Sequence, residues 1–249
     1  MRIAVAGGTG VVGRHVVDIA VDQGHEVVTL ARSAGVDLVT GAGLAARLDG
    51  VDVVVDVTGT REQKRAAAED FFGGVTARLL SAEVDADVRH HVTLSIVGVD
   101  DVDTGYYAGK RRQEQVVTSG PVPWTLLRAT QFHEFAEQAL GFVRLGPVSL
   151  VPKMRTQPIA AQEVAQALAA LALGAPAGRA ADLAGPEQHD LVVLARRVAA
   201  VRRAGGRRQR VVPVGLPGSG GRAMREGALL PSSDGPRGRQ TFDQWLAGA

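Results

Sequence analysis

Residues 2–13 read RIAVAGGTGVVG, an apolar run that leads directly into a cluster of glycines. The run at residues 3–6 predicts a strand, residues 14–23 a helix and residues 26–30 a second strand, so the chain opens with a βαβ unit. The glycine spacing is G-x-x-G-x-x-G. A turn of this kind seats a pyrophosphate, because Gly7 can take the tight turn, Gly10 lets the backbone approach phosphate and Gly13 permits close helix packing. The opening therefore predicts a dinucleotide site.

The same alternation continues downstream. Strands are predicted at residues 36–40, 51–57, 91–96 and 124–128, and helices at residues 43–48, 61–80 and 106–118. Strands alternating with helices predict an α/β fold, a doubly wound parallel sheet of the Rossmann type.

Beyond residue 130 the pattern loosens. Helices are expected near residues 132–140, 161–173 and 191–203, short strands near 147–151 and 180–183, and surface loops at 205–221 and 231–238. We place a boundary at residue 130. Residues 1–130 are the expected cofactor-binding core, and residues 131–249 complete the sheet and build a small substrate-side lobe.

Composition excludes several classes of protein. The 249 residues include no cysteine, which removes disulfides, thiolate metal sites and cysteine nucleophiles, and the six histidines lack metal-ligand spacing. We therefore expect no metal. No apolar run is long enough for a membrane span, and Met1 and Arg2 lead straight into a strand without a signal segment. A cytoplasmic enzyme or binding protein, acting on a small molecule, is the expectation.

An arginine cluster at Arg196, Arg197, Arg202, Arg203, Arg207, Arg208 and Arg210 raises the question of nucleic acid. It has no interleaved aromatic residues and no recognisable DNA-binding motif, so a solvated helix face and loop is the better interpretation. No nucleic-acid partner is expected.

The end of the second strand bears on the choice of nicotinamide cofactor. An acid there would pair with a ribose 2′-hydroxyl, but the sequence has Arg32 and Ser33. The arginine offers a planar cation to a 2′-phosphate and the serine a hydroxyl. We expect NADP(H) rather than NAD(H), although Arg32 could also be an ordinary solvated arginine.

Tyr106 and Lys110 supply a candidate catalytic pair. Four residues apart on a helix, they share a face, so the ammonium could lower the pKa of the phenol and bond a cofactor ribose. Tyr106 is then a candidate general acid for a carbonyl oxygen, with Ser95, at the end of the preceding strand, as a second donor. The Y-x-x-x-K spacing is common by chance, and Tyr107 could instead line the pocket.

Together, the stretches AVAGGTGVVGRHVV, LARS, VDVVVDVTG, HHVTLSIVG, GYYAGKRRQEQVV and SGPVPWTLLRATQFHEF resemble the atypical, NmrA-like branch of the short-chain dehydrogenase/reductase superfamily. The resemblance is specific over about residues 1–135. It implies NADPH along the carboxyl ends of the strands and a reductase of a carbonyl or quinone, with an aromatic polyketide intermediate of secondary metabolism as one candidate substrate.

The resemblance also assigns residues. Around the pyrophosphate it places Gly7, Thr9, Gly10, Val11, Val12 and Gly13; at the 2′-phosphate Arg32 and Ser33; beneath the adenosine Thr58 and Gly59; at the carbonyl Ser95 and Tyr106; and at the ribose Lys110. Residues 129–133 would close over the nicotinamide. The candidate substrate pocket comprises Tyr107, Gln131, Phe132, His133 and Met154, although Phe132 and Met154 could simply fill the core.

Two departures from the family pattern stand out. Residues 39–43 lack the aspartate that often contacts adenine, and Ala129 replaces a common proline. Some members of this branch bind NADP(H) without turnover and regulate a protein partner, which is the alternative function for this chain.

Overall fold

The computed structural model describes residues 1–204 and 209–248. At its centre lies a parallel sheet with the strand order β2-β1-β3-β4-β5-β9. The strands are β1 (Arg2–Ala6), β2 (Glu26–Leu30), β3 (Val53–Asp56), β4 (His90–Ile96), β5 (Trp124–Ala129) and β9 (Gly178–Arg179). Crossovers between parallel strands confirm the predicted Rossmann-like α/β fold.

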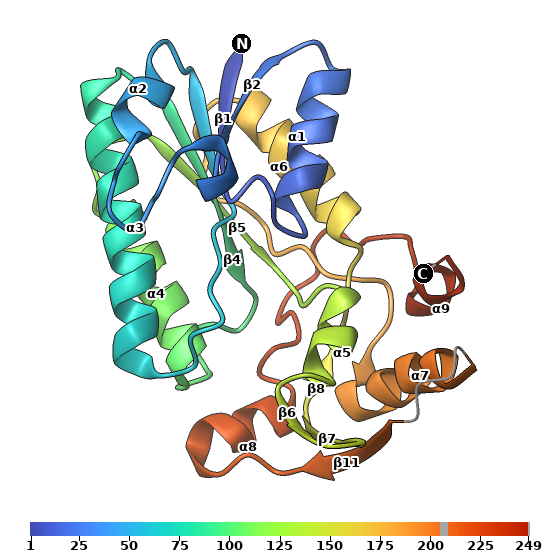
Figure 1. Cartoon of the computed structure of the whole chain (residues 1–249). Helices are drawn as coiled ribbons and strands as arrows, with labels where there is room; N and C mark the ends of the chain where they lie inside the picture. Colours follow the sequence, from blue (N-terminus) through green and yellow to red (C-terminus); the bar gives the residue numbers. More distant parts are fainter. Residues whose placement is uncertain (205–208, 249) are drawn as a thin grey trace.

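Helices cover both faces of this sheet (Figure 1). On one face α1 (Gly13–Asp22) packs beside α6 (Ala161–Leu173), and on the other lie α2 (Leu44–Leu48), α3 (Arg65–Asp85) and α4 (Gly105–Thr118). Every residue of β3 is buried, as expected of a β-branched strand with helices on both sides. Apolar side chains from α6 join the cluster beneath β1, β3, β4 and β5. The chain after residue 130 therefore shares a core with the chain before it.

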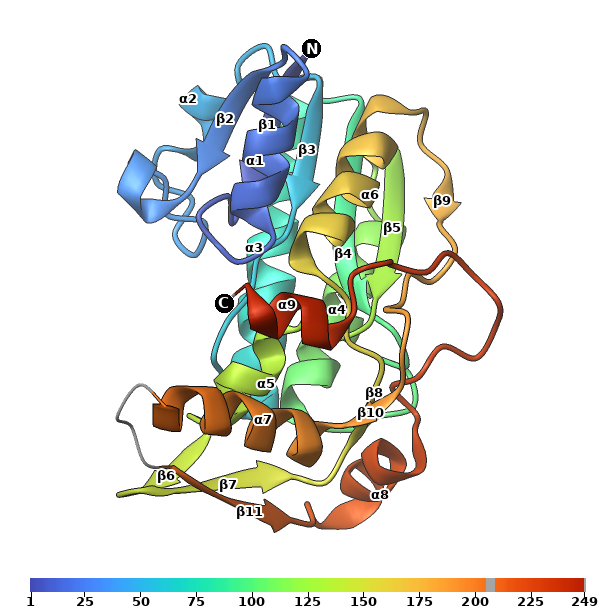
Figure 2. The same ribbon diagram turned by 90° about the vertical axis from the view of Figure 1, so that its right-hand side faces the viewer.

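The rest of the chain forms a lobe beyond the carboxyl ends of the central strands (Figure 2). A small sheet in the order β11-β7-β6 packs against α7. The elements of the lobe are α5 (Glu134–Ala139), β6 (Val143–Leu145), β7 (Val148–Pro152), β8 (Arg155–Thr156), β10 (His189–Asp190), α7 (Leu191–Ala204), β11 (Arg210–Val214), α8 (Gly218–Glu226) and α9 (Phe242–Ala247). Assigning this lobe to the substrate remains a prediction.

The strand expected at residues 36–40 is wrong. The Asp37 carboxylate accepts the backbone N–H groups of Val39 (2.8 Å) and Thr40 (3.3 Å), which folds the segment into a turn. Gly41 and Gly43 follow with positive φ angles, which an extended strand does not use. The central sheet thus ends at β2 on this side.

The loop expected at residues 205–221 is also wrong in part. Residues 210–214 form β11, which pairs in parallel with β7, and residues 218–226 form α8. Valines at three of the five β11 positions suit a strand once β7 offers an edge. The strand expected at residues 180–183 is displaced to β9, with a single bridge from Leu183 to Ala129.

Two further observations apply to the described residues. None of their helices is long and apolar enough to cross a membrane, and they contain no group of three or more histidine, aspartate or glutamate residues that could hold a metal ion. Of the arginine cluster, Arg207 and Arg208 lie outside the described residues. Arg196 and Arg210 are exposed, while Arg197 and Arg202 pair with Asp243 and Glu137.

Candidate active site

The glycine turn connects β1 to α1 and is tightly folded. Gly7 has φ +80°, and its N–H donates to the carbonyl of Leu30 at the end of β2 (3.2 Å). A Cβ atom on Gly13, the first residue of α1, would lie 2.2 Å from the carbonyl oxygen of Gly7, so only glycine fits there. Thr9 and Gly10 form the exposed tip. The turn therefore presents backbone and the N-terminus of α1, which is the arrangement that binds phosphate.

The two valines of the turn differ in their surroundings. Val12 is buried in the apolar core and caps α1, whereas Val11 is half-buried and lines a cavity of about 400 Å³ against α5 and α7. Sequence reasoning grouped both with the cofactor loop. Only Val11 borders open space.

The end of β2 lies beside this turn because of the Gly7–Leu30 hydrogen bond. Arg32 and Ser33 follow in a short 3₁₀ helix, Arg32–Ala34, and both are exposed. They can reach a group bound at the turn from the solvent side. Their contact with the phosphate next to the adenosine ribose stays a prediction.

The end of β3 reaches the same edge. A Cβ atom on Gly7 would lie 2.9 Å from the carbonyl oxygen of Val57, and one on Gly59 would lie 3.9 Å from the Tyr106 hydroxyl. The hydroxyl of Thr58 is buried without a hydrogen-bond partner among the described residues. The segment after β3 thus joins the glycine turn to the candidate catalytic tyrosine.

Tyr106 lies in the first turn of α4, edge-on to the rings of Phe72 (5.4 Å between centroids) and Tyr107 (6.1 Å). Burial raises the pKa of its phenol to about 12. The expected lowering by Lys110 is not observed. Ser95, near the end of β4, is buried, and its hydroxyl lacks a partner among the described residues.

Lys110 points into the protein. Its ammonium donates to the carbonyl of Leu94 (2.7 Å) and to Oε1 of Gln113, and it lies 4.8 Å from the ring centre of Phe72. Burial lowers its pKa to about 8, although the charges of Asp56 and Glu114 oppose that shift. The ribose contact expected from the family pattern therefore competes with contacts that this ammonium already makes.

Gln113 connects Lys110 to β3 through hydrogen bonds. Its Nε2 donates to Oδ2 of Asp56 (2.8 Å), and Oδ1 of Asp56 accepts the backbone N–H of Thr58 (2.9 Å). Asp56 and Gln113 are both fully buried. The chain Lys110–Gln113–Asp56–Thr58 links α4 to the cofactor edge. Sequence reasoning missed Asp56 and Gln113. The polar residue ending the apolar run of β3, and an amide at position i+3 from the lysine, were the available signals.

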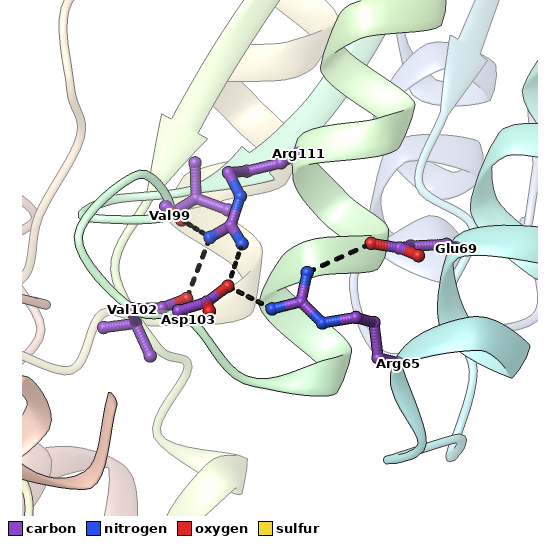
Figure 3. A network of polar contacts seen from close by, with 6 residues as sticks. All are labelled: Arg65, Glu69, Val99, Val102, Asp103 and Arg111. Carbon is purple, nitrogen blue, oxygen red and sulfur yellow. Dashed lines mark hydrogen bonds and ion pairs between the residues drawn. The ribbon is translucent and has the colours of Figure 1, made fainter. Parts of the chain in front are cut away.

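The loop before α4 is fastened by arginines (Figure 3). The Arg111 guanidinium donates to the carbonyls of Val99 (2.7 Å) and Val102 (2.9 Å) and pairs with Asp103, which also pairs with Arg65 of α3. These bonds tie the approach to Tyr106 against two helices. The tyrosine is consequently held by the fold around it, not only by its own helix.

A second arginine fixes the same loop from β5. Arg128 donates to both carboxylate oxygens of Glu114 and, at 2.7 Å, to Asp100. Burial alone would lower the arginine pKa, but the two acids outweigh it and raise the pKa further above its usual range. Arg128 thereby connects β5, α4 and the loop that follows β4.

The expected substrate residues do not form one pocket. Gln131 is buried and accepts the Thr156 hydroxyl (2.7 Å), and Phe132 packs against the main core. His133 is fully buried: its Nε2 lies 3.1 Å from the Gln240 carbonyl, and its ring packs on Phe242 and Trp245 of α9.

Of the remaining two, Tyr107 is buried beside Tyr106, and burial raises its pKa. Met154 belongs to the apolar core of the lobe and also borders a separate cavity of about 390 Å³. Neither this cavity nor the one beside Val11 is lined by Ser95 or Tyr106. Burial also lowers the pKa of His133, which lies inside the lobe.

The parts that fit a dinucleotide are therefore the glycine turn, the cation after β2 and the end of β3, all at one edge of a Rossmann-like sheet. These define the class: an NAD(P)-binding α/β protein. A family model described as NAD(P)H-binding matches residues 7–174. The chain belongs to this NAD(P)H-binding family.

One curated relative is the (4-alkanoyl-5-oxo-2,5-dihydrofuran-3-yl)methyl phosphate reductase of Streptomyces griseus, 35% identical over 145 residues. The match spans 52% of this chain and 48% of the relative, so the chain covers about half of that protein.

Two solved structures resemble the whole chain. An NADPH-dependent quinone oxidoreductase from Escherichia coli, complexed with NADPH, has a TM-score of 0.71 at 17% identity and covers 99% of both chains. A short-chain dehydrogenase/reductase superfamily protein from Agrobacterium tumefaciens, with bound NAD, has a TM-score of 0.69 at 20% identity, covering 100% of this chain and 95% of the other. At these identities the similarity establishes the fold.

Proposed function

We propose that the protein is an NADPH-dependent oxidoreductase that reduces the carbonyl of a ketone or quinone. The observation that carries this proposal is the convergence of the glycine turn, the end of β3 and the Tyr106 hydroxyl, with Gly59 between them. The reductase relative and the quinone oxidoreductase fold support the reaction class. The cytoplasm is the proposed location, and an aromatic polyketide ketone or quinone of secondary metabolism is the proposed substrate class.

NADPH, when bound, supplies a hydride to the carbonyl carbon. Tyr106 then gives its phenolic proton to the carbonyl oxygen, and the phenolate recovers a proton from water. A phenol with a pKa of about 12 is protonated at neutral pH, so the proton to be transferred is present. The unpartnered Ser95 hydroxyl is available to donate a second hydrogen bond to that oxygen.

Lys110 donates a hydrogen bond near the end of β4, and it is connected to Asp56 through Gln113. Its proposed contact to the ribose requires it to exchange one of its present acceptors for a ribose hydroxyl. Below a pH of about 8 the group is protonated and can donate.

The preference for NADPH rests on Arg32. Replacing it with alanine removes the exposed cation at the end of β2, so NADPH should bind about tenfold more weakly while NADH affinity changes little. Fluorescence titration of both cofactors measures this. Equal losses for NADPH and NADH would contradict the assignment to the 2′-phosphate, and failure of the wild-type protein to bind either would overturn the proposed function.

The catalytic role of Tyr106 is tested by Tyr106→Phe. The variant keeps the ring that packs on Phe72 but has no proton to give, so kcat for ketone or quinone reduction should fall about 10²- to 10⁴-fold. NADPH affinity should remain close to that of the wild type. A variant with wild-type kcat would remove Tyr106 from the mechanism.

A second candidate function is an NADP(H)-sensing regulator without turnover. It is favoured by the Lys110 ammonium, which bonds Leu94 and Gln113 rather than Tyr106. This alternative predicts tight NADPH binding, no NADPH consumption with a panel of ketones and quinones, and a stable protein partner in a pull-down.

A further inference from the structure

The lobe contains a cavity of about 390 Å³ that lies apart from the glycine turn. It is bounded by the segment from β7 to β8, the start of α7, β11 and α8. Its polar walls are Lys153, Arg155, Arg196, Arg225 and Asp190, and we call it the lobe cavity. Its volume falls in the range of small-molecule sites.

Positive charge dominates the lobe cavity, because four cations face one carboxylate. Two other arginines of α7 have acidic partners: Arg197 pairs with Asp243, and Arg202 pairs with Glu137. Among the residues that the structure describes, none of the four cavity cations makes an ion pair. Asp190 offsets only part of this charge, so the cavity keeps an excess of positive charge, which favours an anionic ligand.

Two of the guanidinium groups are held in place by neutral partners. Arg155 donates to Oε1 of Gln188 (2.8 Å), and Arg225 donates to the carbonyl of Leu216 (2.9 Å). These bonds fix the side chains and leave their charges uncancelled. Lys153 and Arg196 are exposed and can swing toward a ligand. Two cations with fixed partners and two further exposed cations therefore line the same cavity.

We propose that the lobe cavity binds a compact, multiply charged anion of the phosphate type. Guanidinium groups donate paired hydrogen bonds to phosphate oxygens, and an ammonium adds a point charge. Met154, Val192 and Pro213 form an apolar wall beside the cations, which suits an organic phosphate better than a bare ion. The shared chemistry of the ligand is a phosphate or diphosphate group, from a phosphorylated metabolite or from free pyrophosphate.

Isothermal titration of the full chain with inorganic pyrophosphate tests the proposal, with fructose 1,6-bisphosphate as the organic arm. Each titration is performed at constant ionic strength, with and without saturating NADPH, because the glycine turn also suits pyrophosphate. We expect one saturable site that persists with NADPH. Lys153→Ala and Arg196→Ala should each weaken it about tenfold, and tighter binding of the bisphosphate would indicate a metabolite.

The matched control is Arg222→Ala, an exposed arginine of α8 that does not line the cavity. It should bind both anions as the wild type does. The proposal is overturned by the absence of saturable heat, by an equal loss in Arg222→Ala, or by complete displacement with NADPH. Circular dichroism of each variant checks folding, so that lost heat in a folded variant reports lost binding.

Discussion

The turn after β1 and the start of α8 are both glycine-rich, but the glycines of the turn lie beside an exposed tip and those of the helix pack inside the lobe. In the turn, a Cβ atom on Gly13 would lie 2.2 Å from the carbonyl oxygen of Gly7, and the neighbouring tip of the turn is exposed to solvent. At the start of α8, a Cβ on Gly221 would lie 2.1 Å from the Leu216 carbonyl, and the residue is buried. Close backbone approach is therefore common to both, and only the exposed turn points to a ligand.

The largest expected effect comes from a buried polar pair at the amino end of β4, in the same half of the chain as the glycine turn. His91 and Glu83 form a fully buried pair 2.9 Å apart. Glu83→Gln leaves the histidine without its charged partner and should cost about 3–5 kcal/mol in the free energy of unfolding. Urea denaturation measures this loss. NADPH affinity of the folded fraction should not change, since the pair lies away from the carboxyl edge of the sheet.

The same pair predicts a pH dependence. Burial alone would lower the His91 pKa, but the charge and hydrogen bond of Glu83, with help from Asp56, raise it above 6.5. A raised folded-state pKa means that the stabilisation is present in full below pH 6.5 and is lost as the pH rises through the folded value. Stability curves of wild type and Glu83→Gln should therefore converge at higher pH. Parallel curves would show that the pair does not titrate.

Gly13→Ala is expected to have the next largest effect. The added methyl group forces the turn away from α1, so NADPH affinity should fall roughly 100-fold, equivalent to about 2.7 kcal/mol. Gly174→Ala is a matched control, because its Cβ would make an ordinary 3.5 Å contact with Leu171. Fluorescence titration with NADPH compares the affinities of the two variants. Wild-type affinity in Gly13→Ala would show that the glycine turn does not differ from the start of α8 in its importance for cofactor binding.

Gly221→Ala should have the smallest effect. The clash distorts the start of α8 and should cost about 1–3 kcal/mol, as overpacking of a filled site does. NADPH affinity should stay within about twofold of the wild type, since α8 belongs to the lobe. A large loss of affinity would mean that the lobe shapes the cofactor site.

The N-terminal half was predictable because its signals are local. The β-branched run of β3, the glycine turn and the helix spacing of α4 each lie within a few residues. The error at residues 36–40 arose because Asp37 folds the segment through its own side chain. In the lobe, β11 requires β7, some sixty residues earlier in the sequence, as its pairing partner, so its own residues alone did not reveal it.

The candidate site divides in the same way. Positions fixed by spacing, such as Gly13 and Tyr106, could be proposed from sequence alone. The direction of Lys110 depends on Gln113, which in turn bonds Asp56, 57 residues away, and no local pattern encodes that contact. His133 was predicted to line a pocket because its own neighbours in sequence do not indicate that α9, from the end of the chain, covers it.

The covering of His133 by α9 also constrains how the chain can fold during synthesis. The imidazole bonds the carbonyl of Gln240, 107 residues further on, and packs against Phe242 and Trp245. When the glycine turn and the whole central sheet have left the ribosome, the residues of α9 that cover His133 are still inside it. The nucleotide half can thus acquire its structure on the nascent chain, while the interior around His133 closes only after residue 245 has left the exit tunnel.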